Sequence, residues 1–357
     1  MCRCHCWSGD QQRRCVVCHC WSGDRQRRCV VCHCWSGDQQ QRCKKLLYKQ
    51  LQVYLEIAIF HPVLIAYLAL LGVTFFWGFT FPIVQWSLDD SSPILFVAAR
   101  FAIAALLFPV LFGKKSISFN PQLIKRGLVL GALLCGGYIF QTIGLAHTTS
   151  ARAGFITALY VPFTPLFGAL FFRARIRKRM WLAAAIAFAG ILAMSLPETL
   201  VDGKPVLTQM ALNHGDKLIL VCAVCYAVHI LLINRWSTPD SELPLAWLQI
   251  SATSLIAMAA LPVETLHFEL TRELAVSLVF TAVFASVIAI WAMMKFQPRV
   301  PVTGAAIVYS MEPVTAGLAA WILQNHVPPT LTLLGAALIL AAMLIASTIQ
   351  EPEVPRS

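Results

Sequence analysis

The sequence predicts an all-α membrane protein with ten transmembrane helices, arranged as two inverted five-helix repeats with both termini in the cytoplasm. Three observations predict this fold: the composition, a row of long apolar segments and an internal duplication. Of the 357 residues, 58% are hydrophobic and only 13% are charged, and the mean hydropathy is +0.69. A water-soluble globular domain is usually about one-quarter charged. A chain of this composition therefore exposes its helices to lipid rather than to water.

Residues 1–49 differ in character from the rest of the chain. The motif Cys-His-Cys-Trp-Ser-Gly-Asp begins at Cys4, Cys18 and Cys32, with a strict period of 14 residues, and ten of the 13 cysteines lie in this tract. Repeats that stack into a fold usually run about 20 residues or more and drift in sequence. We therefore expect a disordered low-complexity tail or a translated upstream repeat. A soft-metal site is the alternative, but the Cys-X-Cys spacing lacks the CxxC pairs of structural zinc sites, so we predict no metal.

The net charge of +11 does not indicate a nucleic-acid partner. Residues 1–49 hold ten Lys and Arg against three Asp, whereas the remaining 308 residues hold 18 basic side chains against 14 acidic ones. Outside the tail, no basic stretch is interleaved with aromatic residues in the way that nucleic-acid-binding surfaces are. We expect the lipid bilayer and a small-molecule substrate as partners, and no nucleic acid.

Ten apolar segments approach the length of about 20 residues that crosses a bilayer. They are 64–86, 93–112, 126–145, 152–172, 180–196, 216–234, 244–262, 274–294, 302–323 and 330–349. The loops after even-numbered segments and the C-terminus hold 13 Lys and Arg, whereas the other loops hold four. Because cytoplasmic loops carry the excess of basic residues, the sequence predicts a multi-pass protein of the inner membrane with cytoplasmic termini.

The second half of the chain repeats the first with a shift of about 150 residues. The clearest matched pairs are Gly154 with Gly304, Arg100 with Gln249, Gln85 with Asn234, and Trp77 with Tyr226. The two repeats are residues 64–196 and 216–349, with five segments each. An odd number of crossings makes the second copy enter from the opposite face, so the repeats are inverted. Such folds place their substrate site near the bilayer midplane, between the copies.

Several motifs resemble those of EamA-type members of the drug/metabolite transporter superfamily. They are Trp77-Gly78, the segment Thr149–Phe155, and Glu312-Pro313-Val314. The resemblance implies an inner-membrane exporter or importer of amino acids, related metabolites or drugs. One departure concerns the Gly-Glu pair that members commonly carry at the ends of the fourth and ninth spans. Here those ends hold the basic run Arg173–Arg179 and the pair Asn325-His326, which questions the subgroup more than the fold.

Among the Asp, Glu, Lys and Arg residues, Arg100 and Glu312 are the two that lie well inside predicted spans. Charge in the bilayer is costly and usually marks a functional position. Arg100 could clamp a substrate carboxylate with its two-pronged guanidinium group, and Glu312 could exchange a coupling proton. A structural ion pair between the two is the alternative. Pro162 and Pro165 in the fourth span, and Pro313 in the ninth, should break those helices beside the site, because proline lacks a backbone N–H.

A second group of polar and aromatic residues is predicted to line the substrate cavity. It comprises Gln85, Tyr138, Gln141, His229, Asn234, Gln249, Trp291 and Tyr309. For each residue the alternative is a structural role. Buried polar side chains hydrogen-bond between membrane helices, and Trp and Tyr gather at the membrane interfaces.

The sequence thus predicts a secondary transporter, a permease or exporter of small metabolites such as amino acids, amines or drugs, that works by alternating access. We predict no enzymatic activity and no cofactor, because no GxxxxGK[ST], HExxH or GxSxG motif is present. A membrane-embedded enzyme and a non-transporting structural or sensory membrane protein are the alternatives. The GxxxG motif Gly127–Gly131 fits close helix packing, and a homodimer remains compatible with the sequence.

Overall fold

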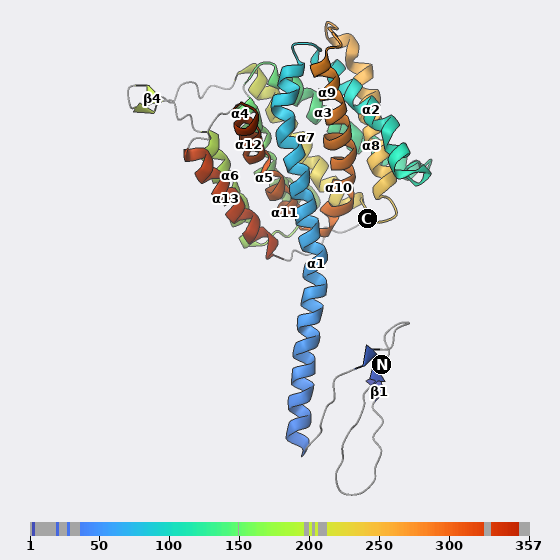
Figure 1. The fold of residues 1–357 in the computed structure, drawn as a ribbon, viewed down its shortest axis with the longest axis vertical. Helices are drawn as coiled ribbons and strands as arrows, with labels where there is room; N and C mark the ends of the chain where they lie inside the picture. Colours follow the sequence, from blue (N-terminus) through green and yellow to red (C-terminus); the bar gives the residue numbers. More distant parts are fainter. Residues whose placement is uncertain are drawn as a thin grey trace. The chain divides into compact units, whose positions relative to one another are not determined.

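The computed structural model describes five two-residue strands and the backbone of residues 36–148, 150–195, 213–324 and 330–349 (Figure 1). It divides the chain into two units, Met1–Pro62 and Val63–Ser357. In the first unit, β1 (Cys2–Arg3), β2 (His19–Cys20) and β3 (Arg27–Arg28) pair antiparallel in that order. The rest of the 14-residue repeat, up to residue 35, lies outside the described residues, so its interpretation as a disordered tail or translated repeat stays a prediction.

The first helix begins earlier than the sequence analysis predicts. It is α1 (Ser36–Ser87), whereas the apolar segment starts at residue 64. Residues 39–61 contain neither Gly nor Pro, so nothing in them stops a helix from extending upstream of the apolar part. The portion Pro62–Ser87 is the part that is long and apolar enough to cross a membrane.

The second unit is built of helices. They are the end of α1, α2 (Pro93–Phe112), α3 (Pro121–Leu145), α4 (Ser150–Thr157), α5 (Tyr160–Phe172), α6 (Lys178–Ser195), α7 (His214–Trp236), α8 (Glu242–Ala260), α9 (Arg272–Phe280), a π-helix η3 (Thr281–Ile288), α10 (Ala289–Phe296), α11 (Val302–Tyr309), α12 (Glu312–Gln324) and α13 (Thr330–Ser347). Short 3-10 turns η1 (Lys114–Ser116), η2 (Leu261–Val263) and η4 (Gln297–Arg299), and the strand pair β4 (Leu200–Val201) and β5 (Lys204–Pro205), complete it.

Six segments of the described chain are long and apolar enough to span a membrane. They are Pro62–Ser87, Pro93–Phe112, Pro121–Leu145, His214–Trp236, Glu242–Val263 and Arg272–Arg299. The apolar helices Tyr160–Phe172 and Leu333–Ser347 are shorter. Every predicted span coincides with a helix or with consecutive helices, but the count of ten crossings and the orientation of the termini stay predictions.

Two predicted spans are each interrupted by a short break. The fourth is split at Ala158-Leu159, between α4 and α5, and the ninth at Ser310-Met311, between α11 and α12. Each break precedes its proline, so Pro162 and Pro313 fall in the first turn of the helix that follows, where a missing N–H costs nothing. Pro165 lies inside α5, which continues through it. The breaks lie 152 residues apart, at equivalent points of the duplication.

The two halves of the chain pack against each other through their helices. In Figure 1, α6 lies beside α13 and α2 beside α8, and both pairs are in contact. The contact of α3 with α8 has its counterpart in the contact of α2 with η3. A Cβ atom on Gly127 or Gly131 would stand 2.5 Å from a Cβ of α8. The GxxxG motif therefore joins two helices of one chain and gives no support to a homodimer.

Candidate substrate pocket

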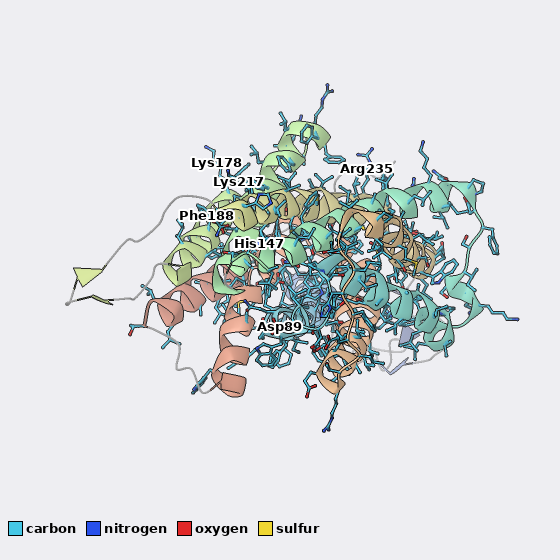
Figure 2. The ribbon with its side chains drawn as sticks, turned by 90° about the horizontal axis from the view of Figure 1, so that it is seen from above. Asp89, His147, Lys178, Phe188, Lys217 and Arg235 are labelled. Atoms are coloured by element: carbon cyan, nitrogen blue, oxygen red, sulfur yellow. The ribbon has the colours of Figure 1, made fainter. Side chains whose placement is uncertain are left out.

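A pocket lies inside the helical bundle of the described residues, among the side chains that Figure 2 draws. The lining residues come from α1, α3, α5, α7, α10, α11 and α12, so both halves of the chain contribute. They are Trp77, Thr80, Leu134, Tyr138, Gln141, Tyr160, Tyr226, His229, Ile230, Met293, Tyr309 and Glu312.

Equivalent positions of both halves of the duplication line the pocket. Trp77 and Thr80 on α1 correspond to Tyr226 and His229 on α7, 149 residues later, and all four line the pocket. The first residues of the helices after the two breaks line the pocket as well, Tyr160 of α5 and Glu312 of α12. The pocket thus lies where inverted-repeat transporters bind substrate, between the copies and beside broken helices.

Hydrogen bonds and ring contacts fix the aromatic side chains of the wall. The rings of Trp77 and Tyr309 lie 5.5 Å apart, and those of Tyr138 and Tyr226 lie 5.9 Å apart, edge to face. The Tyr226 hydroxyl donates to Gln141 Oε1 at 3.4 Å. Both distances between rings fall in the range where aromatic pairs attract, so these contacts favour the observed positions of the rings.

Arg100 lies behind the wall, not in it. The residue is only 2% exposed, and its Nε donates to Ser286 Oγ at 2.8 Å. Its Nη2 donates to the Ala285 carbonyl at 3.2 Å and to the Tyr138 hydroxyl at 3.3 Å. Ala285 also accepts a hydrogen bond from Trp77 Nε1 at 3.0 Å. Because both acceptors on η3 belong to a π-helical turn, Arg100 ties this irregular turn to the pocket wall.

Glu312 contributes the carboxylate of the pocket. Its side chain is 7% exposed, and its own backbone carbonyl accepts a hydrogen bond from Thr315 Oγ1 at 3.0 Å. Within the described part of the chain no ion pair joins Glu312 to a basic residue, so the predicted alternative of a pair with Arg100 is wrong. Arg100 donates its hydrogen bonds to neutral oxygens instead. The position of Glu312 at the N-terminus of α12 favours a negative charge through the helix dipole.

Tyr160 carries an unused hydrogen-bonding group. The residue is 2% exposed, and its hydroxyl has no partner among the residues that the structure describes. Buried hydroxyls are nearly always hydrogen-bonded, and exceptions call for an explanation such as a bound ligand or an ion. A ligand in the pocket would supply that partner.

The remaining predicted residues lie around the pocket or away from it. Gln249 lies behind His229, whose Nε2 is 2.8 Å from Gln249 Oε1. Asn234 is hydrogen-bonded to Gln297, whose Oε1 in turn accepts from the Tyr309 hydroxyl at 3.0 Å, so it supports the wall from behind.

Trp291 and Gln85 do not line the pocket. Trp291 packs against Phe112 and Phe296, with Lys295 Nζ at 5.0 Å from its ring. This arrangement matches the interface alternative for Trp291. Gln85 is partly exposed near the end of α1.

The sequence analysis named five residues that line the pocket, namely Tyr138, Gln141, His229, Tyr309 and Glu312. It missed Trp77, Thr80, Tyr160 and Tyr226 as lining residues. A signal for them existed. Trp77 and Tyr226 are equivalent in the duplication, and Tyr160 and Glu312 each lie within two residues of the proline that follows a helix break.

Comparison with known proteins identifies the family. The EamA-like transporter family matches residues 64–196 and 213–348. An uncharacterized transporter of Archaeoglobus fulgidus is 32% identical over 285 residues, which cover 80% of this chain and 86% of that protein. An inner membrane transporter of Escherichia coli, YedA, is 28% identical over 265 residues (70% of this chain, 80% of the relative).

The S-adenosylmethionine uptake transporter of Rickettsia prowazekii is 22% identical over 243 residues (68% of this chain, 78% of the relative). A solved crystal structure shares the fold with a TM-score of 0.63 at 19% identity, over 79% of this chain and 96% of that one. With both halves of the helical unit matched, the chain is a multi-pass inner-membrane protein of the transporter class, and it belongs to the EamA-like transporter family.

Proposed function

We propose that the protein is a secondary transporter of small organic metabolites, with ten membrane-crossing helices in two inverted repeats and both termini in the cytoplasm. The observation that carries the proposal is the pocket lined by equivalent residues of both halves, beside the two helix breaks. Rocking of one repeat against the other would open this pocket to each side in turn. Because the site lies between the halves rather than within one, any such motion acts directly on the bound molecule.

The arrangement of basic and aromatic residues supports the proposed orientation. Arg126 lies 5.8 Å from the ring of Trp236, Arg235 lies 5.7 Å from the ring of Phe172, and Lys295 contacts Trp291. All belong to helix ends that the proposed topology places at the cytoplasmic face. Basic side chains beside an aromatic belt are typical of that interface.

Transport by the reconstituted full-length protein tests the proposal. Proteoliposomes are loaded with a panel of amino acids, amines and drug-like molecules, and exchange is measured with and without a pH gradient. Thr80→Phe places a ring in the pocket and should abolish exchange of every transported molecule. Leu68→Phe adds the same ring on an exposed face of α1, where Leu68 is 58% exposed, and should leave exchange unchanged. Exchange by folded Thr80→Phe at the wild-type rate would refute the assigned site.

A further inference from the structure

We propose that the pocket selects organic cations, amines or quaternary ammonium groups on an apolar or flat body, and that it excludes molecules whose charged group is a carboxylate. This inference rests on the proposed function, since it names the substrate class of the same pocket. It is carried by the distribution of charge in the wall, by the aromatic rings and by Tyr160 and Glu312, the first residues of the helices after the two breaks.

The charged lining of the pocket is acidic. Glu312 is its carboxylate, and no Lys or Arg is among the lining residues. Arg100, which lies behind the wall, makes its hydrogen bonds to Ser286, Ala285 and Tyr138. A substrate carboxylate would therefore meet Glu312 without a free cation to receive it, and like charges in a buried site repel each other. An ammonium group would supply the missing counter-charge.

Five aromatic residues line the pocket that such a cation would enter, and one of them, Tyr138, already has the Arg100 guanidinium carbon 4.5 Å from its ring centre. Trp77, Tyr138, Tyr160, Tyr226 and Tyr309 come from five different helices, α1, α3, α5, α7 and α11. The negative faces of aromatic rings attract cations, Trp and Tyr more than Phe, and cages of such rings recognise quaternary ammonium groups. A neutral or anionic group gains nothing comparable from these faces, so the rings and the carboxylate favour the same class of ligand.

Tyr160 and Glu312 together give the ligand an orientation. Each is the first residue of the helix that follows a break, and each lines the pocket. The Tyr160 hydroxyl, which has no partner in the described residues, can accept from a ligand N–H or donate to a ligand oxygen. Glu312 can only accept while it is ionised. The cationic head therefore binds at Glu312, and a polar group of the body can reach Tyr160.

Four probes that share one phenyl ring separate charge from shape. The full-length protein in detergent is titrated with phenethylamine (cation), 2-phenylethanol (neutral), 3-phenylpropionate (anion) and phenylalanine (zwitterion), and phenyltrimethylammonium tests the quaternary case. We expect both cations to bind saturably and at least about tenfold more tightly than the other three, as a desolvated cation–π contact and a counter-ion together allow. This comparison uses the unmodified protein, so it does not depend on the folding of any variant.

Two substitutions assign the selectivity to Glu312. Glu312→Gln should weaken phenethylamine binding by about 30-fold or more, because a buried charge pair loses one partner, and should leave phenylethanol binding unchanged. Glu273→Gln removes an exposed carboxylate at the start of α9 and should change neither. Unchanged phenethylamine binding in folded Glu312→Gln overturns the inference.

Failure of the inference differs from failure of the proposed function. Tighter binding of phenylalanine or phenylpropionate than of the cations overturns the cation class, as does the absence of saturable cation binding. If Thr80→Phe then still blocks exchange of whichever molecules are transported, the pocket remains the transport site. If Thr80→Phe leaves exchange intact, the proposed function loses its site as well.

Discussion

Two tyrosines of the pocket wall allow a test in which one missing oxygen atom has opposite effects. Tyr160→Phe removes a buried hydroxyl without a partner in the described residues. Tyr309→Phe removes a hydroxyl that donates to Gln297 Oε1 at 3.0 Å, on a residue that is 1% exposed. Both substitutions keep the ring and add no atom, so packing stays constant and the change isolates the hydrogen bond.

The expected stabilities follow from the state of each hydroxyl. An unsatisfied buried polar group costs about 1–3 kcal/mol, so Tyr160→Phe should raise the free energy of unfolding by about 1 kcal/mol. Tyr309→Phe breaks an interhelical hydrogen bond and should lower it by about 1 kcal/mol. The difference of about 2 kcal/mol corresponds to about 3 °C in apparent Tm for a protein of this size. Thermal unfolding in detergent, followed by tryptophan fluorescence, measures it.

Tyr160→Phe should weaken ligand binding although it raises the free energy of unfolding. A saturating amine raises the Tm of the wild-type protein by mass action, and we expect this rise to shrink in Tyr160→Phe because the hydroxyl partner of the ligand is gone. Greater stability together with weaker binding is typical of a residue that serves function at the expense of the fold. A less stable Tyr160→Phe variant with undiminished ligand binding would refute the reasoning, since the hydroxyl would then have an internal structural role.

Three further predictions concern packing, orientation and the tail. Gly78→Ala should lower stability by about 1–3 kcal/mol, because its Cβ would lie 1.9 Å from Thr315 Oγ1; Gly72→Ala on the same helix has nothing within 4 Å and should be neutral or stabilising in the same unfolding assay. A reporter active only in the cytoplasm should be active when fused at Lys114 and inactive at Asp90, and the reverse result would contradict the proposed orientation. A chain that begins at Leu51 should insert and exchange substrate as the full chain does, and joint loss of bound zinc and transport would show that the repeat is a domain.

Long apolar runs made most of the fold predictable, because bilayer thickness sets helix length independently of tertiary contacts. The two breaks were predictable from Pro162 and Pro313 for a similarly local reason. The hydrogen-bond partners of Arg100 were not predictable from the sequence. They depend on the π-helical turn Thr281–Ile288, which holds no Gly or Pro to mark it. The position of Trp291 was open as well, since the sequence does not say which face of a helix that is apolar all round meets its neighbours.

The duplication bears on both the lining of the pocket and the selectivity proposed for it. Trp77 and Tyr226 are equivalent positions that both line the pocket, and the helices after the two breaks begin with Tyr160 and Glu312. A perfectly symmetric site would bind an asymmetric ligand in two orientations of equal energy. The two helix starts differ, with a hydroxyl in the first copy and a carboxylate in the second, and this difference removes that degeneracy. The charge on one side of the pocket then fixes the orientation of the ligand, while the aromatic residues common to both sides hold its body.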